Sequence, residues 1–253
     1  MTEPHPNIDK ARAVLVLAAT IGTLVFNWLA AQGWVNGATP AEISARFPTE
    51  ITPAGYAFSI WTLIYAGLLA FSLYQLFSRP GIWIREVRSF YILSCALNCA
   101  WIFVWNSGQI AVAFGIIVAL LAVLVVINVK ARRSRSALES LFARVPFELY
   151  LGWVAIAACA NFAVLLASYG IDVNAGSHFF GTTMVLLAAA FGVFFRVRLT
   201  SYFVPLAIAW GLTGIAVEQS GKTLIVAAAA VGVVACLIAS CSAVLDLKSS
   251  RDE

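Results

Sequence analysis

The sequence has few charged residues for its length. Asp, Glu, Lys and Arg together make up 11% of its 253 residues, whereas hydrophobic residues make up 62%. An ordinary soluble domain is roughly a quarter charged and about half apolar. So few charges cannot cover the surface of a water-soluble globule of this size. The composition therefore excludes a cytosolic enzyme, a disordered chain and a secreted disulfide scaffold, and predicts a polytopic membrane protein.

Metal-binding and redox motifs are also missing. All five cysteines fall inside apolar runs, without zinc-type or redox CxxC spacing. Only two histidines occur, and the chain has no HExxH motif, no phosphate-binding loop and no nucleophile elbow. The sequence predicts no required cofactor and no metal site. An enzyme is the functional class that it favours least.

No carboxylate or histidine lies in the middle of an apolar run. Glu148 and Glu218 come closest, and both stand at the end of one. Transporters that couple to protons or sodium usually carry such a group deep in the membrane, because it must exchange the ion. This absence argues against an ion-coupled transporter and leaves a facilitator open.

Long apolar runs dominate what the sequence does contain, and each is long enough for a membrane-spanning helix of about 20 residues. The eight runs are residues 11–32, 54–77, 88–106, 109–129, 146–168, 178–195, 201–217 and 222–245. The third and fourth are joined so tightly, at residues 106–109, that they should form an antiparallel hairpin. Residues 118–127 lack the alternation that a membrane β-barrel requires. The predicted fold class is therefore an all-α polytopic bundle of eight transmembrane helices.

The positive charges predict the orientation of this bundle. With the N-terminus in the cytoplasm, only Arg46 and Lys222 of the 16 Lys and Arg residues fall on the opposite face. Cytoplasmic loops normally carry such an excess of positive charge. We therefore expect both termini inside, in a bacterial inner membrane. The net charge of +4 then reflects contact with membrane lipids and not with nucleic acid.

Three runs place aromatic and amide side chains along one helical face, with spacings of i, i+3 and i+7. The second run contributes Phe58, Trp61 and Tyr65; the third contributes Asn98, Trp101 and Trp105; and the fifth contributes Tyr150, Trp153, Ala157 and Asn161. Asparagine inside a bilayer needs hydrogen-bond partners, so these faces should point toward other helices. Converging rings would form a flat apolar slot for a planar or polycyclic ligand. Spacing alone leaves open the alternative that these residues only pack the helices together.

These motifs resemble those of the TspO/MBR family, the tryptophan-rich sensory proteins that include the mitochondrial translocator protein. The second-helix motif W-x-x-x-Y matches residues 61–65, and the third-helix motif A-L-N-x-x-W matches residues 96–101. The fifth-helix motif Y-x-x-W-x-x-x-A-x-x-x-N matches residues 150–161. The resemblance covers roughly residues 11–168.

The resemblance implies a five-helix bundle that binds porphyrins and other hydrophobic ligands, including sterols, in an internal pocket. The pocket positions that it carries over are Trp61, Tyr65, Asn98, Trp101, Trp153, Ala157 and Asn161. In the family, the loop between the first two helices covers the pocket. Residues 33–52 are therefore the expected lid, with a short helix at residues 40–46 capped by Thr39.

We expect two parts: a TspO-like five-helix core at residues 1–170, and a three-helix extension with a short cytoplasmic tail at residues 171–253. Pro205 should kink the seventh span, and no motif assigns a role to the extension. The expected function is the binding of a hydrophobic ligand, with tetrapyrroles as candidates, in a sensory, regulatory or transport role. Two alternatives stay open: a facilitator or transporter of a hydrophobic metabolite, and an accessory or assembly subunit of a membrane complex. A homodimer is also a candidate state.

Overall fold

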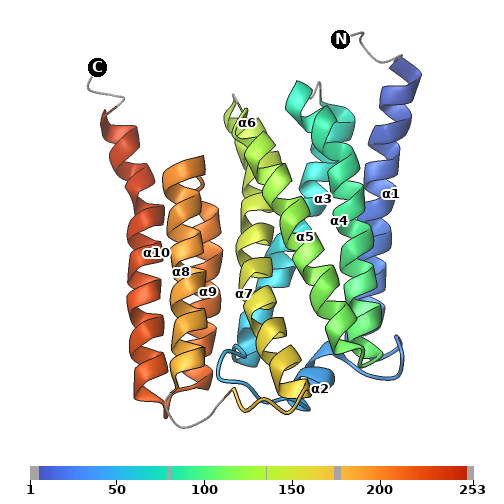
Figure 1. Ribbon diagram of the computed structural model, residues 1–253. Coiled ribbons are helices and arrows are strands. Elements are labelled where there is room, and N and C mark those ends of the chain that lie inside the picture. Colours follow the sequence, from blue (N-terminus) through green and yellow to red (C-terminus); the bar gives the residue numbers. More distant parts are fainter. Residues whose placement is uncertain (1–5, 79–80, 135, 174–177, 250–253) are drawn as a thin grey trace. The chain divides into compact units, whose positions relative to one another are not determined.

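The computed structural model describes residues 6–78, 81–134, 136–173 and 178–249. Arg79, Arg135 and Arg251, which belong to the positive charges predicted to be cytoplasmic, lie outside these residues. Helices make up most of the described chain (Figure 1). The long ones are α1 (Pro6–Ala31), α3 (Ile60–Phe77), α4 (Ile82–Asn106), α5 (Ile110–Ala131), α7 (Val145–Ser168), α8 (Phe179–Leu199), α9 (Phe203–Glu218) and α10 (Thr223–Ser249). The short ones are α2 (Pro40–Ala45), the 3-10 helix η1 (Gly55–Ser59), α6 (Ala137–Glu139) and the π-helical turn η2 (Ser140–Arg144).

Each of the eight predicted spans corresponds to one long helix. Within the described residues, seven helical stretches are long and apolar enough to cross a membrane, and α9 is a shorter apolar helix of 16 residues. The prediction of an all-α polytopic membrane bundle is therefore confirmed. The orientation of the chain across the membrane stays a prediction, because the helices themselves do not show which of their ends face the cytoplasm.

Two predicted features of the helices differ from the structure. The helix α4 begins at Ile82, six residues before the predicted start of the third span at Arg88. The predicted span begins at Arg88 and would leave its charge at the membrane surface, yet the Arg88 side chain is buried among the helices. Pro205 lies in the first turn of α9 and not at a kink inside a span. At that position its missing N–H removes no helical hydrogen bond.

The chain forms two compact units. Unit 1 contains Met1–Arg46 and Thr62–Phe147, and unit 2 contains Phe47–Trp61 and Glu148–Glu253. Most of α7 thus groups with the three C-terminal helices, although the sequence analysis assigns it to the first part. The predicted boundary at residue 170 is a division along the chain and stays a prediction.

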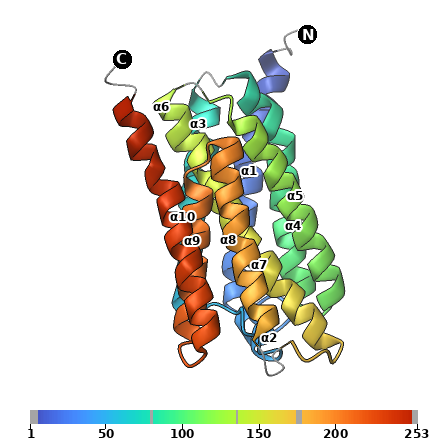
Figure 2. The same cartoon turned by 60° about the vertical axis from the view of Figure 1, so that its left-hand side comes forward.

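In unit 1, α4 packs against both α1 and α5 (Figures 1 and 2). The predicted hairpin of the third and fourth spans is confirmed, because α4 ends at Asn106 and α5 begins at Ile110. Gly108 makes this turn possible, since its φ of 72° lies in the left-handed region that favours glycine. The rings of Phe71, Tyr91 and Phe147 meet edge to face in the core of the unit, with centroids 4.8–5.6 Å apart.

In unit 2, α8, α9 and α10 pack side by side in both views (Figures 1 and 2). The contact of α9 with α7 is close because glycines line it. A Cβ atom on Gly152 would lie 2.5 Å from the Val204 carbonyl oxygen, and one on Gly211 would lie 2.8 Å from the Ile156 side chain. Beside this contact, the buried Glu148 carboxylate accepts a hydrogen bond of 2.9 Å from the Phe203 amide at the start of α9. Small residues allow such helix backbones to approach each other closely.

The predicted short helix after Thr39 is confirmed as α2. The Thr39 side chain accepts from the Glu42 amide, and the Glu42 carboxylate accepts from the Thr39 amide at 2.7 Å, which completes a capping box. The hydrogen bond from the Thr39 amide, followed by the one from its side chain, lowers the pKa of Glu42 below its ordinary value. The start of α2 therefore stabilises the ionised form of Glu42 relative to its protonated form.

This capping box predicts a pH-dependent helix. Because folding lowers the pKa of Glu42, the contribution of its carboxylate is fully present above the pKa of the unfolded chain. That contribution disappears as the pH falls through the lower value of the folded chain. A carboxyl NMR titration of Glu42 should give a midpoint below that of a free glutamate side chain, and Thr39→Ala should raise the midpoint toward it. The shift in Thr39→Ala should be partial, because the backbone amide of residue 39 remains; a wild-type midpoint equal to that of a free glutamate side chain would contradict this assignment.

Candidate functional site

Four of the predicted site residues have aromatic rings that contact one another in unit 2. These residues, Phe58, Trp61, Tyr150 and Trp153, are called the aromatic cluster below. Trp153 meets Phe58 with ring centroids 5.6 Å apart and Trp61 with centroids 6.3 Å apart, both nearly perpendicular. Trp61 also meets Tyr150 at 5.8 Å. Such edge-to-face pairs contribute roughly 0.5–1.5 kcal/mol each beyond simple burial.

Local structure explains how the aromatic cluster forms. Phe58 lies in η1 and Trp61 in the first turn of α3, whereas Tyr150 and Trp153 lie three residues apart on one face of α7. Tyr150 and Trp153 are buried, at 3% and 2% exposure, while Phe58 is 45% exposed and Trp61 is half-buried. The cluster thus has a buried base and a more exposed rim.

Ala157 and Asn161 continue the same α7 face beyond Trp153. Ala157 is half-buried and Asn161 is 5% exposed. The Asn161 side-chain amide donates to the Ala157 carbonyl oxygen at 2.9 Å, one turn earlier in the helix. The prediction that Asn161 is turned away from lipid agrees with its burial. Its predicted role in orienting a ligand stays a prediction.

The other four predicted residues belong to unit 1, where Asn98 and Tyr65 share a partner that the sequence analysis did not single out. Asn27 of α1 donates from its side-chain amide to Asn98 Oδ1 at 2.8 Å, and its own Oδ1 accepts from the Tyr65 hydroxyl. Asn27 and Asn98 are 9% and 1% exposed. The prediction that a buried asparagine must have hydrogen-bond partners therefore holds for Asn98, and the partner is another asparagine.

Trp101 and Trp105 stack with ring centroids 5.7 Å apart and planes at 25°. Trp105 is buried, and its indole N–H donates to the Pro40 carbonyl oxygen of α2 at 3.1 Å. Nearby, the Asn106 side chain donates to the Ala38 carbonyl oxygen at 2.9 Å. The end of α4 thus holds the first half of the expected lid, residues 33–46, within unit 1.

A polar seam, defined here as the hydrogen-bonded side chains along one face of α1, continues from Asn27 toward the start of that helix. The Thr20 hydroxyl lies 2.6 Å from the Ser72 hydroxyl and 2.7 Å from the Tyr91 hydroxyl. Thr23 interacts with Cys99 on α4. All of these groups lie inside unit 1, so α1, α3 and α4 are joined by hydrogen bonds as well as by apolar packing.

The polar seam ends at a buried ion pair. The Arg88 side chain is 1% exposed and donates to Asp9 Oδ1 at 2.7 Å and to Gln75 Oε1 at 2.9 Å. Gln75 in turn donates to the Ala13 carbonyl oxygen at 2.9 Å. Asp9 and Asn27 are 18 residues apart on α1, which corresponds to about 27 Å of helix, close to the hydrocarbon thickness of a bilayer.

The sequence contained a signal for part of this seam. Thr20, Thr23 and Asn27 follow the same i, i+3 and i+7 spacing that identified the aromatic faces. The run at residues 11–32 carries no aromatic residue on the face of Thr20, Thr23 and Asn27. The aromatic pattern that marks the other three faces is therefore missing from it.

The long apolar helices of the described chain define a multi-pass, all-helical integral membrane protein. A family model described as TSPO-like protein matches residues 13–242. The chain therefore belongs to the TSPO-like proteins. The match extends through α8 and α9 into α10, so these helices lie within the pattern of the family model and not outside it. Comparison with curated proteins finds no match, and comparison with solved structures finds none either.

The ten predicted site residues thus fall into two groups: six in unit 2, around the aromatic cluster, and four in unit 1, around Asn98 and Trp101. Within each group, specific contacts join several of the members. The prediction that both groups line one pocket stays a prediction.

Proposed function

We propose that this TSPO-like protein binds a flat, hydrophobic ligand at the aromatic cluster, and that tetrapyrroles are the first ligand class to test. The observation that carries the proposal is that the buried rings of Tyr150 and Trp153 contact the more exposed rings of Phe58 and Trp61. A planar ligand gains most from rings that are held in place before it arrives, because few rotamers are then lost on binding. Membership of the TSPO-like family supports the same reading.

The proposed role is sensory, regulatory or transport-related, in a bacterial inner membrane. Its support is the excess of positive charge on one predicted face together with the apolar helices. Purification in mild detergent, followed by absorbance and mass spectrometry of co-purified small molecules, tests whether a tetrapyrrole is bound. Flux of the same ligand across liposomes would separate a transporter from a binder that only senses.

Removing the centre of the aromatic cluster should weaken ligand binding. Trp153→Leu deletes two edge-to-face contacts at once, and we expect the affinity for protoporphyrin IX to fall about tenfold, equivalent to about 1.4 kcal/mol. The measurement is a titration of porphyrin absorbance in lipid nanodiscs, with circular dichroism to verify folding.

The matched control is Trp28→Leu, because Trp28 is 56% exposed on α1 and contacts Trp34 instead of the aromatic cluster. Since Trp153 is buried, Trp61→Leu serves as a second variant with less risk to the fold. Unchanged affinity in both folded cluster variants would eliminate this site.

A further inference from the structure

The segment that carries Phe58 and Trp61 is held by α9, which belongs to the three C-terminal helices. The Ala54 amide donates to the Gly214 carbonyl oxygen at 3.0 Å. The Trp210 indole N–H donates to the Ala57 carbonyl oxygen at 2.8 Å, and the Trp210 ring meets Tyr56 edge to face at 5.5 Å. Two residues of α9 spaced i and i+4, Trp210 and Gly214, therefore contact the residue before η1 and the middle of η1.

The 3-10 helix η1 depends on such outside support. Its residue before the first turn, Ala54, offers no side-chain cap, and 3-10 hydrogen bonds have poorer geometry than those of an α-helix. Gly214 allows η1 to approach α9, since a Cβ atom there would lie 2.7 Å from the Ala57 Cβ and 3.1 Å from the Pro53 Cβ. The contact of η1 with α9 therefore sets the position of Phe58, together with local backbone preference.

The residues just before η1 are fixed to the C-terminal helices by charge. Glu50 is 2% exposed, and its Oε1 lies 2.6 Å from His178 Nδ1 at the start of α8 and 3.2 Å from Lys222 Nζ just before α10. Gln219, after α9, donates from its side chain to the Thr49 carbonyl oxygen at 3.3 Å. Both groups lie in unit 2, so the chain is anchored here before it reaches η1.

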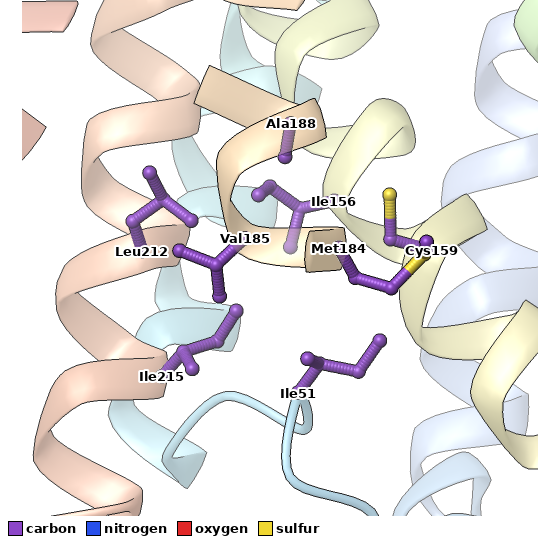
Figure 3. A pocket seen from close by; sticks show the side chains of 8 residues that line it. All are labelled: Ile51, Ile156, Cys159, Met184, Val185, Ala188, Leu212 and Ile215. Atoms are coloured by element: carbon purple, nitrogen blue, oxygen red, sulfur yellow. The ribbon is translucent and has the colours of Figure 1, made fainter. Parts of the chain in front are cut away.

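Apolar packing adds a third anchor. Ile51 is 2% exposed and points into an apolar seam between α7, α8 and α9 that is too narrow to admit a water molecule (Figure 3). Figure 3 shows Ile156 and Cys159 of α7, Val185 of α8 and Ile215 of α9 around it. Residues 49–57 thus contact α8, α9 and Lys222, the residue just before α10.

We propose that the C-terminal helices hold the ligand site in shape, and that Trp210 is a positioning residue that sets the place of Phe58 and Trp61 through η1. This inference rests on the proposed function, because it assumes that the aromatic cluster binds the ligand. It assigns a role to helices for which the sequence motifs gave none. In this view α8–α10 act on ligand affinity without touching the ligand.

The test compares the full chain with Trp210→Phe in lipid nanodiscs. The variant keeps an aromatic ring beside Tyr56 but loses the indole N–H, so the Ala57 carbonyl oxygen loses its bond from α9. A neutral hydrogen bond contributes about 1 kcal/mol, so the affinity for protoporphyrin IX should fall roughly fivefold. Hydrogen exchange without ligand should accelerate in the peptide covering residues 54–61. The control is Trp28→Phe, which should change neither readout.

The two readouts separate this inference from the proposed function. Faster exchange together with weaker porphyrin binding in Trp210→Phe alone supports the inference. Unchanged exchange overturns it, and faster exchange with unchanged affinity overturns it as well. If the wild-type chain binds no porphyrin, the proposed ligand is wrong, while the exchange rates still decide whether α9 holds η1.

A second variant guards against a folding defect. Gly214→Ala displaces η1 directly, because the added methyl group would meet Ala57, and Gly221→Ala is its matched control, with no atom within 4 Å of the added Cβ. A folded Gly214→Ala chain should show the same faster exchange at residues 54–61 and the same loss of affinity. A folded Gly214→Ala chain with unchanged values of both would overturn the inference.

Discussion

Asp9→Ala is expected to destabilise the protein by about 3 kcal/mol, because it leaves the Arg88 guanidinium buried without its charged partner. Breaking a buried ion pair costs about 3–5 kcal/mol, and the 20% exposure of Asp9 places this one at the lower end. Gln75 still accepts two hydrogen bonds from Arg88, at its side-chain oxygen (2.9 Å) and at its carbonyl oxygen (3.5 Å), which reduces the loss. The measurement is unfolding in mixed detergent micelles with increasing SDS, followed by circular dichroism.

The control for this prediction is Arg85→Gln. The Arg85 Nε lies 3.8 Å from Asp9 and its side chain is 37% exposed, so its removal should cost less than about 1 kcal/mol. A double variant, Asp9→Leu with Arg88→Met, should recover most of the stability lost in Asp9→Ala, because apolar side chains do not require a partner there. Equal losses for Asp9→Ala and Arg85→Gln would show that Arg88 does not depend on Asp9.

Gly152→Ala should separate α7 from α9. The new Cβ would lie 2.5 Å from the Val204 carbonyl oxygen and 2.8 Å from the Ala207 Cβ, and a backbone atom cannot rotate away as a side chain can. Overpacking of a tight core costs about 1–3 kcal/mol, and this contact should reach the upper end. The same SDS unfolding assay measures the effect.

Gly115→Ala on α5 provides the contrast. No atom lies within 4 Å of a Cβ at Gly115, so the methyl group meets open space. Alanine is the better helix former by roughly 0.5–1 kcal/mol, so this change should be neutral or slightly stabilising. If both variants lost the same stability, the close approach of α7 and α9 would not be the cause.

How much the sequence predicts depends on whether a signal is local. The eight helices were predictable because each apolar run carries its own information, and Trp61, Tyr150 and Trp153 were found because their spacing marks one helical face. The start of α4 was missed because Arg88 looks like a residue outside the membrane until its pairing with Asp9 is known.

Contacts between distant residues were beyond such reasoning. Glu50 and His178 are separated by 128 residues, and no spacing rule joins them. The link from Trp210 to Ala57 spans 153 residues. The sequence therefore indicated which faces carry aromatic side chains, while the part of the chain that holds them in place emerged only from the packing.

The polar seam restricts how α1 can move. Its donors and acceptors are matched to α3 and α4 at Asn27, at Thr20 and at the Asp9–Arg88 pair. Sliding α1 by one residue would shift it by about 1.5 Å and turn it by about 100°, which would break all three connections together. These contacts fix the register of α1 against α3 and α4. Any displacement of α1 on ligand binding must therefore move the three helices together as one rigid group.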